Sequence, residues 1–189
     1  MKKILYIVIF TVISFVSLSF KIYPSQYLLL EEKIYYSAYD GKIELEGADV
    51  NTFEKLGYDY AKDSKHIYHR GKIVETADVE SFIILGKVYL GIHDNAYAKD
   101  KYKVYFYGKS IEGIDLSTFE VFDNRIARDK SNVYFVGNRL SNIDISTFTY
   151  IEELCSVDSW CMFPESVFKD KNGVYKTNDK DFTKKFIVK

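Results

Sequence analysis

Residues 129–148 read DKSNVYFVGNRLSNIDISTF, and the order of residues in this stretch recurs along the chain. An Asp is followed by Tyr and Gly, then by a second Asp fifteen positions after the first and by a Phe four positions later. Full copies begin at Asp63, Asp100 and Asp129. A partial copy precedes them and a truncated one follows, marked by Tyr35, Gly41, Asp49 and Phe53 and by Asp170 and Tyr175. A residue that recurs in every copy is expected to build the unit.

The copy at residues 97–122 shows how one unit is expected to fold. Residues 97–100 are expected to form a short strand, and residues 104–107 are a β-branched and aromatic run that favours a second strand. Between them the Asp100 side chain can accept hydrogen bonds from backbone amides in a turn. Gly108 marks a second turn, and a third short strand follows. Asp115 to Phe119 is typical of an N-cap over a single helical turn.

Such a unit is too small to be stable alone, so neighbouring units must stack and share a core. The sequence therefore predicts a mostly β fold, a tandem array of β-hairpin or meander repeats, each with a short helical turn. The alternative is a small propeller-like β fold. We expect the repeat domain to cover residues 34–189, with copies at about 34–56, 60–85, 97–122, 126–151 and 167–180, after a linker at residues 23–33.

The first 22 residues stand apart from the rest of the chain. Lys2 and Lys3 precede an uncharged apolar run from Ile4 to Phe20, a pattern typical of export. Two interpretations remain, an uncleaved N-terminal membrane helix or a signal peptide that is cleaved. Either places the rest of the chain outside the cytoplasm, anchored in the membrane or secreted.

Charge and composition exclude some classes of function. The chain has 26 basic and 27 acidic side chains and no basic stripe, so a nucleic-acid partner is not expected. No nucleophile elbow and no phosphate-binding loop is present. His66 and His69 fall in a predicted turn and strand, which does not favour a metal site. We expect no cofactor, no metal and no catalytic residues.

The turn segments carry a resemblance to a known family. Residues 100–105, 129–134 and 170–175 read DKYKVY, DKSNVY and DKNGVY, which resemble the Asp-Lys-Asn-Tyr-Tyr motif of the bacterial DKNYY family. The resemblance covers roughly residues 34–180, although His69, Phe106, Phe135 or Lys176 stands where the motif has its second Tyr. It implies an exported or envelope-associated bacterial protein and implies no activity.

A few side chains remain as candidates for binding. Tyr102 and Tyr107 alternate with the recurring tyrosines along a strand and are candidates for exposed contact residues. Trp160 lies in a connector that is not repeated, between Cys155 and Cys161. In an exported protein these cysteines are candidates for a disulfide, the alternative being two free thiols.

These observations lead to three hypotheses about function. The first is a non-catalytic binding or structural module outside the cytoplasm that contacts a protein or envelope glycan. The second is an envelope enzyme such as a glycan hydrolase, with a site built from unrepeated acids in the connectors: Glu152, Glu153, Asp158 and Glu165. The third is an immunity or inhibitor-type partner protein.

Overall fold

The computed structural model describes residues 26–38, 41–57, 59–86, 97–154 and 165–177. They form five small antiparallel sheets and contain no helix, which confirms the mostly β prediction. The apolar segment at residues 1–22, Trp160 and both cysteines lie outside the described residues. The first strand, β1 (Gln26–Leu30), lies within the stretch 23–33 that the sequence suggests is a linker.

In each sheet the strands pair in chain order. Sheet 1 contains β1, β2 (Lys33–Ala38) and β3 (Gly41–Glu44), and sheet 2 contains β4 (Glu54–Lys55), β5 (Tyr60–Lys62), β6 (Ile67–His69) and β7 (Lys72–Ile73). Sheet 3 contains β8 (Ile83–Leu85), β9 (Tyr97–Lys99), β10 (Val104–Phe106) and β11 (Lys109–Ile111). Sheet 4 contains β12 (Glu120–Val121), β13 (Ile126–Arg128), β14 (Val133–Phe135) and β15 (Asn138–Arg139), and sheet 5 contains β16 (Thr149–Leu154), β17 (Glu165–Asp170) and β18 (Gly173–Thr177).

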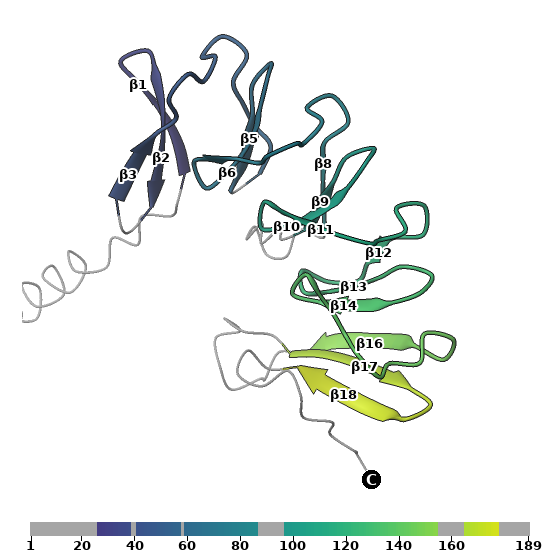
Figure 1. The fold of residues 1–189 in the computed structure, drawn as a ribbon. Coiled ribbons are helices and arrows are strands. Elements are labelled where there is room, and N and C mark those ends of the chain that lie inside the picture. Colours follow the sequence, from purple (N-terminus) through teal and green to yellow (C-terminus); the bar gives the residue numbers. More distant parts are fainter. Residues whose placement is uncertain (1–25, 39–40, 58, 87–96, 155–164, 178–189) are drawn as a thin grey trace, which may run out of the picture.

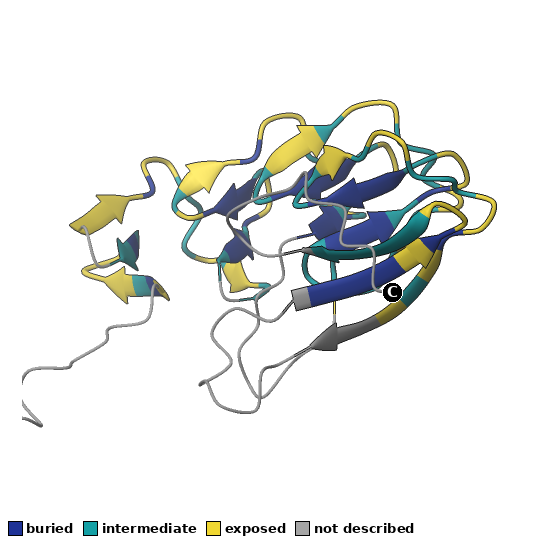
Figure 2. Cartoon of the chain, turned by 90° about the horizontal axis from the view of Figure 1, so that it is seen from below, coloured by how far each residue is buried: buried dark blue, intermediate teal, exposed yellow. Residues whose placement is uncertain are grey.

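The sheets follow one another along an arc, and the apolar cores lie between neighbouring sheets (Figure 1). Strand β14 shows why. Tyr134 packs into the core shared with sheet 3, whereas Val133 and Phe135 pack into the core shared with sheet 5. Because successive side chains of a strand point to opposite faces, a run of three apolar residues serves two cores. Buried residues accordingly gather inside the stack, and exposed residues lie in the turns and in outer strands such as β3 and β7 (Figure 2).

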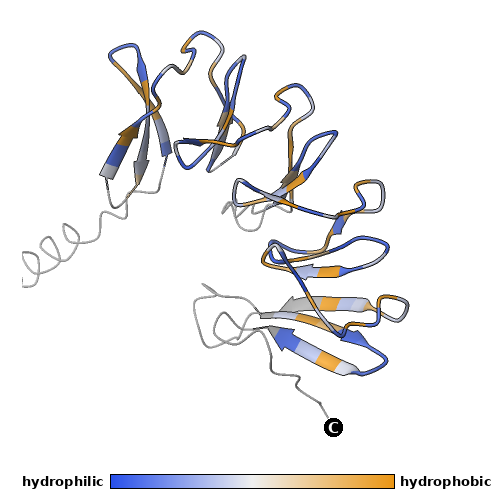
Figure 3. Cartoon of the chain, in the orientation of Figure 1, coloured by the Kyte–Doolittle hydropathy of each residue, from blue (hydrophilic) through white to orange (hydrophobic). Residues whose placement is uncertain are grey.

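Small residues make room for the recurring tyrosines. Ala98 and Ala127 are fully buried and lie directly opposite Tyr105 and Tyr134 in the β9–β10 and β13–β14 ladders. A methyl group beside each ring leaves space for the neighbouring sheet to approach. In sheet 5 Phe168 takes the place of the alanine and stacks on Tyr175. Apolar colour appears on β17 and also on outer strands such as β3 and β16 (Figure 3).

The hairpin between β14 and β15 shows how closely the sheets approach. Val136 and Gly137 both have positive φ, 51° and 73°, as a two-residue turn of this twist requires. A Cβ on Gly137 would lie 2.8 Å from Cβ of Phe106 in sheet 3. Both the backbone angle and the packing therefore require glycine at this position.

The segment expected to form a single helical turn is a tight turn. Asp115 accepts a backbone hydrogen bond from Thr118, 3.3 Å long, and its carboxylate accepts a second one from the same amide at 3.1 Å. The carboxylate therefore caps the turn, and the chain then enters β12. The segment is not helical, and the described residues contain no helix.

Candidate functional site

The turn carboxylates lie at the junctions between sheets. Asp129 is 2 % exposed, and its Oδ1 accepts hydrogen bonds from the backbone amides of Ser131 and Asn132, both 2.7 Å long. Its Oδ2 accepts from the Tyr134 hydroxyl at 2.9 Å and from the Asp115 amide at 3.0 Å. Asp115 lies in the turn that follows sheet 3, so one carboxylate closes its own hairpin and also binds the preceding unit.

The hydrogen bonds keep this buried carboxyl ionised. Burial alone would raise the pKa of Asp129, but the hydrogen bonds from the Asp115 amide and the other donors outweigh it and lower the pKa. Burial and the neighbouring carboxylate raise the pKa of Tyr134 to about 12, so its hydroxyl stays a donor. The pair is a charge-assisted hydrogen bond inside the stack.

The same junction occurs at the three remaining boundaries between the described sheets. Each turn Asp accepts from the amide of an Asp in the preceding turn and from the tyrosine five positions after it. The members are Asp63 with Asp49 and Tyr68, Asp100 with Asp78 and Tyr105, and Asp170 with Asp144 and Tyr175. The pKa of each turn Asp is lowered for the reason given for Asp129.

The second recurring Asp joins the units on the outside. Asp115 forms an ion pair with Lys130 and accepts hydrogen bonds from the Ser117 and Thr118 hydroxyls. Thr118 in turn accepts a hydrogen bond from the Lys130 amide, 3.0 Å long. These partners hold the pKa of Asp115 well below its usual range. Asp78 and Asp144 make equivalent ion pairs with Lys101 and Lys171.

A tyrosine hydroxyl forms a third link between sheets. Tyr97 is buried in sheet 3, and its hydroxyl accepts a hydrogen bond from the Gly137 amide and donates one to the Arg125 carbonyl, both in sheet 4 and both 3.1 Å long. Tyr60 accepts from Gly108 in the same way. The recurring Asp, Tyr and Gly residues thus hold neighbouring units together.

Two of the candidate binding residues from the sequence, Tyr102 and Tyr107, lie at opposite ends of β10. Tyr102 is 64 % exposed in the β9–β10 turn, whereas Tyr107 is half-buried in the β10–β11 turn at the other end of β10. Tyr107 packs on Phe106, with ring centroids 4.7 Å apart, and the Arg70 guanidinium lies over its ring. The structure therefore does not bring the two tyrosines together.

Tyr107 borders a hollow of about 480 Å³ between sheets 3 and 4. The walls come from the β10–β11 hairpin and from the β14–β15 turn, and they are Phe106, Tyr107, Lys109, Ser110, Ile111, Glu112, Val136, Gly137 and Asn138. The hollow combines an aromatic wall with ammonium, hydroxyl, carboxyl and amide groups. Val136 and Asn138 were not predicted from the sequence, because the stacking of two hairpins places them beside the hollow.

His66 and His69 belong to no metal-binding cluster among the described residues. Among these residues no three His, Cys, Asp or Glu side chains come together as a set of metal ligands. His69 is 8 % exposed, its Nε2 has no hydrogen-bond partner among the described residues, and burial lowers its pKa to about 4. Asp158 lies outside the described residues; Glu152 and Glu153 belong to β16 and Glu165 begins β17. The described part of the chain contains no helix able to cross a membrane.

One comparison with known proteins gives a match. The profile of the DKNYY family matches residues 27–179, a stretch that includes all the junctions described above. No curated protein and no solved structure matches the chain.

Proposed function

The chain belongs to the DKNYY family, and we propose that it is a non-catalytic binding module outside the cytoplasm that contacts envelope glycan or protein. The observation that carries this proposal is the use of the recurring side chains. Asp129, Tyr134 and Asp115 are taken up by contacts between adjacent sheets. Positions that differ from unit to unit are therefore left for recognition.

We further propose that the five sheets are tandem repeats of one unit in an open array. Equivalent residues make equivalent hydrogen bonds at successive boundaries, which supports this view. An array of this kind presents a long surface whose stability is supplied by nearest-neighbour contacts. The apolar run from Ile4 to Phe20 supports an export segment that anchors the array in the membrane or is removed from it.

The hollow beside Tyr107 is the part of this surface best suited to a ligand. The position that Tyr107 takes in the β10–β11 turn is taken by Arg70 in sheet 2 and by Val136 in sheet 4. Among these three sheets, only sheet 3 therefore has an aromatic ring at this position. A tyrosine face can cover an apolar patch of a sugar ring, while Lys109, Glu112 and Asn138 supply polar groups for its hydroxyls. The combination favours a glycan at this site.

The test is sedimentation of the full chain, in mild detergent, with protein-free peptidoglycan. We expect the protein to pellet with the glycan and Tyr107→Asn to remain in the supernatant. Asn is suitable because it tolerates the φ of 46° that Tyr107 adopts, so the turn is kept while the ring is removed.

Tyr102→Ser distinguishes the two tyrosine candidates. This exposed residue lies at the other end of β10, so its variant is expected to pellet like the unchanged protein. If Tyr102→Ser remained in the supernatant and Tyr107→Asn pelleted, the glycan site would be assigned to the β9–β10 turn instead. Failure of the unchanged protein to pellet both with bare glycan and with envelopes that retain their proteins would reject the proposed function.

A further inference from the structure

A basic residue precedes the turn Asp in every sheet from the second to the fourth. In sheets 2 and 4 it faces an acid across the ladder. Glu54 lies opposite Lys62, and Glu120 lies opposite Arg128. Both pairs form ion pairs, 3.2 Å and 3.0 Å long. In these two sheets a carboxylate at this position is therefore the partner of the cation.

Sheet 3 departs from this rule. Lys99 is the equivalent cation, but the residue opposite it in β8 is Ile83, which is 49 % exposed. Lys99 forms no ion pair with any of the described residues. In sheet 5 Lys169 faces Thr149, but no further described sheet follows. Lys99 is thus the cation at an inner boundary whose carboxylate partner has been replaced.

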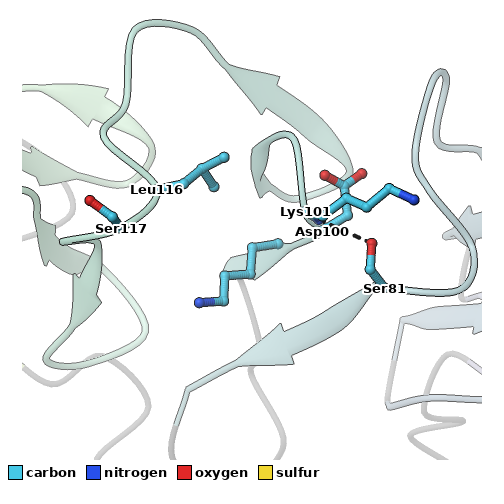
Figure 4. A pocket seen from close by; sticks show the side chains of 6 residues that line it. Ser81, Asp100, Lys101, Leu116 and Ser117 are labelled. Atoms are coloured by element: carbon cyan, nitrogen blue, oxygen red, sulfur yellow. Dashed lines mark hydrogen bonds between the residues drawn. The ribbon is translucent and has the colours of Figure 1, made fainter.

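Lys99 also lines a hollow of about 380 Å³, together with Ser81, Asp100, Lys101, Leu116 and Ser117 (Figure 4). The other two charges of the hollow are already used. Asp100 accepts four hydrogen bonds from its own hairpin and the preceding turn, and Lys101 forms a 2.9 Å ion pair with Asp78. The Lys101 amide donates to the Ser81 hydroxyl, as the dashed line in Figure 4 shows. The charge left for a ligand is the ammonium of Lys99.

We propose that this hollow binds a glutamate or aspartate side chain of an acidic peptide segment in a partner protein. The ligand carboxylate would take the place that Glu54 and Glu120 take in the neighbouring sheets. Leu116 supplies an aliphatic wall for the methylene groups of such a side chain. None of the described residues that line the hollow is aromatic, which favours a peptide over a sugar. The proposal rests on the proposed binding function but uses a site separate from the Tyr107 hollow.

The experiment is fluorescence anisotropy of a labelled oligo-glutamate peptide with the full chain in mild detergent at low salt. We expect saturable binding that weakens with added salt, because partly exposed charges are screened. Lys99→Gln removes the ammonium, and Ile83→Glu supplies the carboxylate from within the sheet. Each change should weaken binding about tenfold or more, as expected for loss of one charge-assisted hydrogen bond.

Lys72→Gln is the matched control, since Lys72 is exposed in β7 and borders neither hollow. It should change the affinity by less than about twofold, which is within the effect of a surface charge. Ile83→Glu restores a pair found in two other sheets, so it should remain folded, and circular dichroism checks this. Binding of oligo-glutamate by Lys99→Gln at unchanged affinity would overturn the proposal.

Two other results would also overturn it. One is the absence of oligo-glutamate binding by the unchanged protein, and the other is preference for polygalacturonate over oligo-glutamate. Neither result would reject the proposed glycan site, because that site is tested separately, by pelleting of the Tyr107→Asn variant with peptidoglycan.

Discussion

Replacement of Asp129 by Asn tests whether the turn carboxylate holds two sheets together. The carboxylate accepts four hydrogen bonds, two on each oxygen. An amide nitrogen cannot accept, so either orientation of Asn loses two of the four. If the nitrogen faces Tyr134, the hydroxyl can rotate to accept from it, and the Asp115 amide is left without its acceptor.

The size of the effect follows from these contacts. A buried donor without a partner costs about 1–3 kcal/mol, and hydrogen bonds to a charged group are worth about twice those to a neutral one. We therefore expect Asp129→Asn to lower the free energy of unfolding by about 3 kcal/mol. The assay is urea unfolding at pH 7 followed by far-ultraviolet circular dichroism.

Glu112→Gln is the control, because it makes the same acid-to-amide change at an exposed residue whose carboxylate contacts only the Ser110 hydroxyl among the described residues. It should alter stability by less than about 0.5 kcal/mol. The difference between Asp129→Asn and the unchanged protein should also shrink as the pH falls below about 4. The folded pKa of Asp129 is lowered, so its contribution is present above the unfolded pKa and is lost as the pH falls through the folded pKa. Equal unfolding curves for Asp129→Asn and Glu112→Gln at pH 7 would refute the role assigned to the junction.

Three further changes test the packing between sheets, each by the same unfolding measurement. Gly137→Ala should lower the free energy of unfolding by about 2 kcal/mol or more, because the new Cβ would meet Phe106 at 2.8 Å. Gly113→Ala is the control: its Cβ would have nothing within 4 Å, so it should cost only the backbone strain of about 1 kcal/mol. Equal losses of stability in the two variants would contradict the close approach of the sheets. Tyr97→Phe removes a hydroxyl that bonds twice to sheet 4 and should cost about 1–2 kcal/mol, and no loss would mean that this link is not needed. Burial lowers the pKa of His69 from 6.5 to about 4. Between these pH values the unfolded chain binds a proton that the folded chain does not bind, so stability falls as the pH drops below 6.5. Between pH 7 and 4.5 the unchanged protein should lose about 2 kcal/mol more than His69→Phe, and equal losses would place the imidazole in water.

The spacing of Asp, Tyr, Gly, Asp and Phe predicted the strands and turns because these elements depend on neighbours in sequence. Asp129 was expected in a turn and Asp115 at a cap, and both carboxylates accept the expected local amides. The hydrogen bond between the two units was not predicted. A periodic sequence looks the same whether a donor lies in its own copy or in the one before, so only the stacked structure distinguishes them.

The candidate sites show the same limit. Tyr107 was selected by strand periodicity, which describes one unit, but its hollow is completed by Val136 and Asn138 from the next. Lys99 was not selected, because its exceptional feature is the residue opposite it, and that residue is identified only by the ladder register. The features that distinguish one sheet from the next therefore lie at positions that only the ladder register and the stacking match in space.

Sheet 1 supplies an internal test of the role assigned to the turn Asp. Its β1–β2 hairpin ends with Leu30 opposite Lys33, where the β17–β18 hairpin has Asp170 opposite Gly173. Leu30 is 43 % exposed, and no described sheet precedes it.

If the turn Asp were needed only to close its own hairpin, sheet 1 would need one too. Sheet 1 instead turns through Glu31 and Glu32, both with positive φ, without a carboxylate at the Leu30 position. The Asp is present where there is a preceding unit to hold and is replaced where none is described. Its recurrence is thus explained by contacts between adjacent sheets, which leaves residues that differ from sheet to sheet, such as Tyr107, for the recognition that we propose.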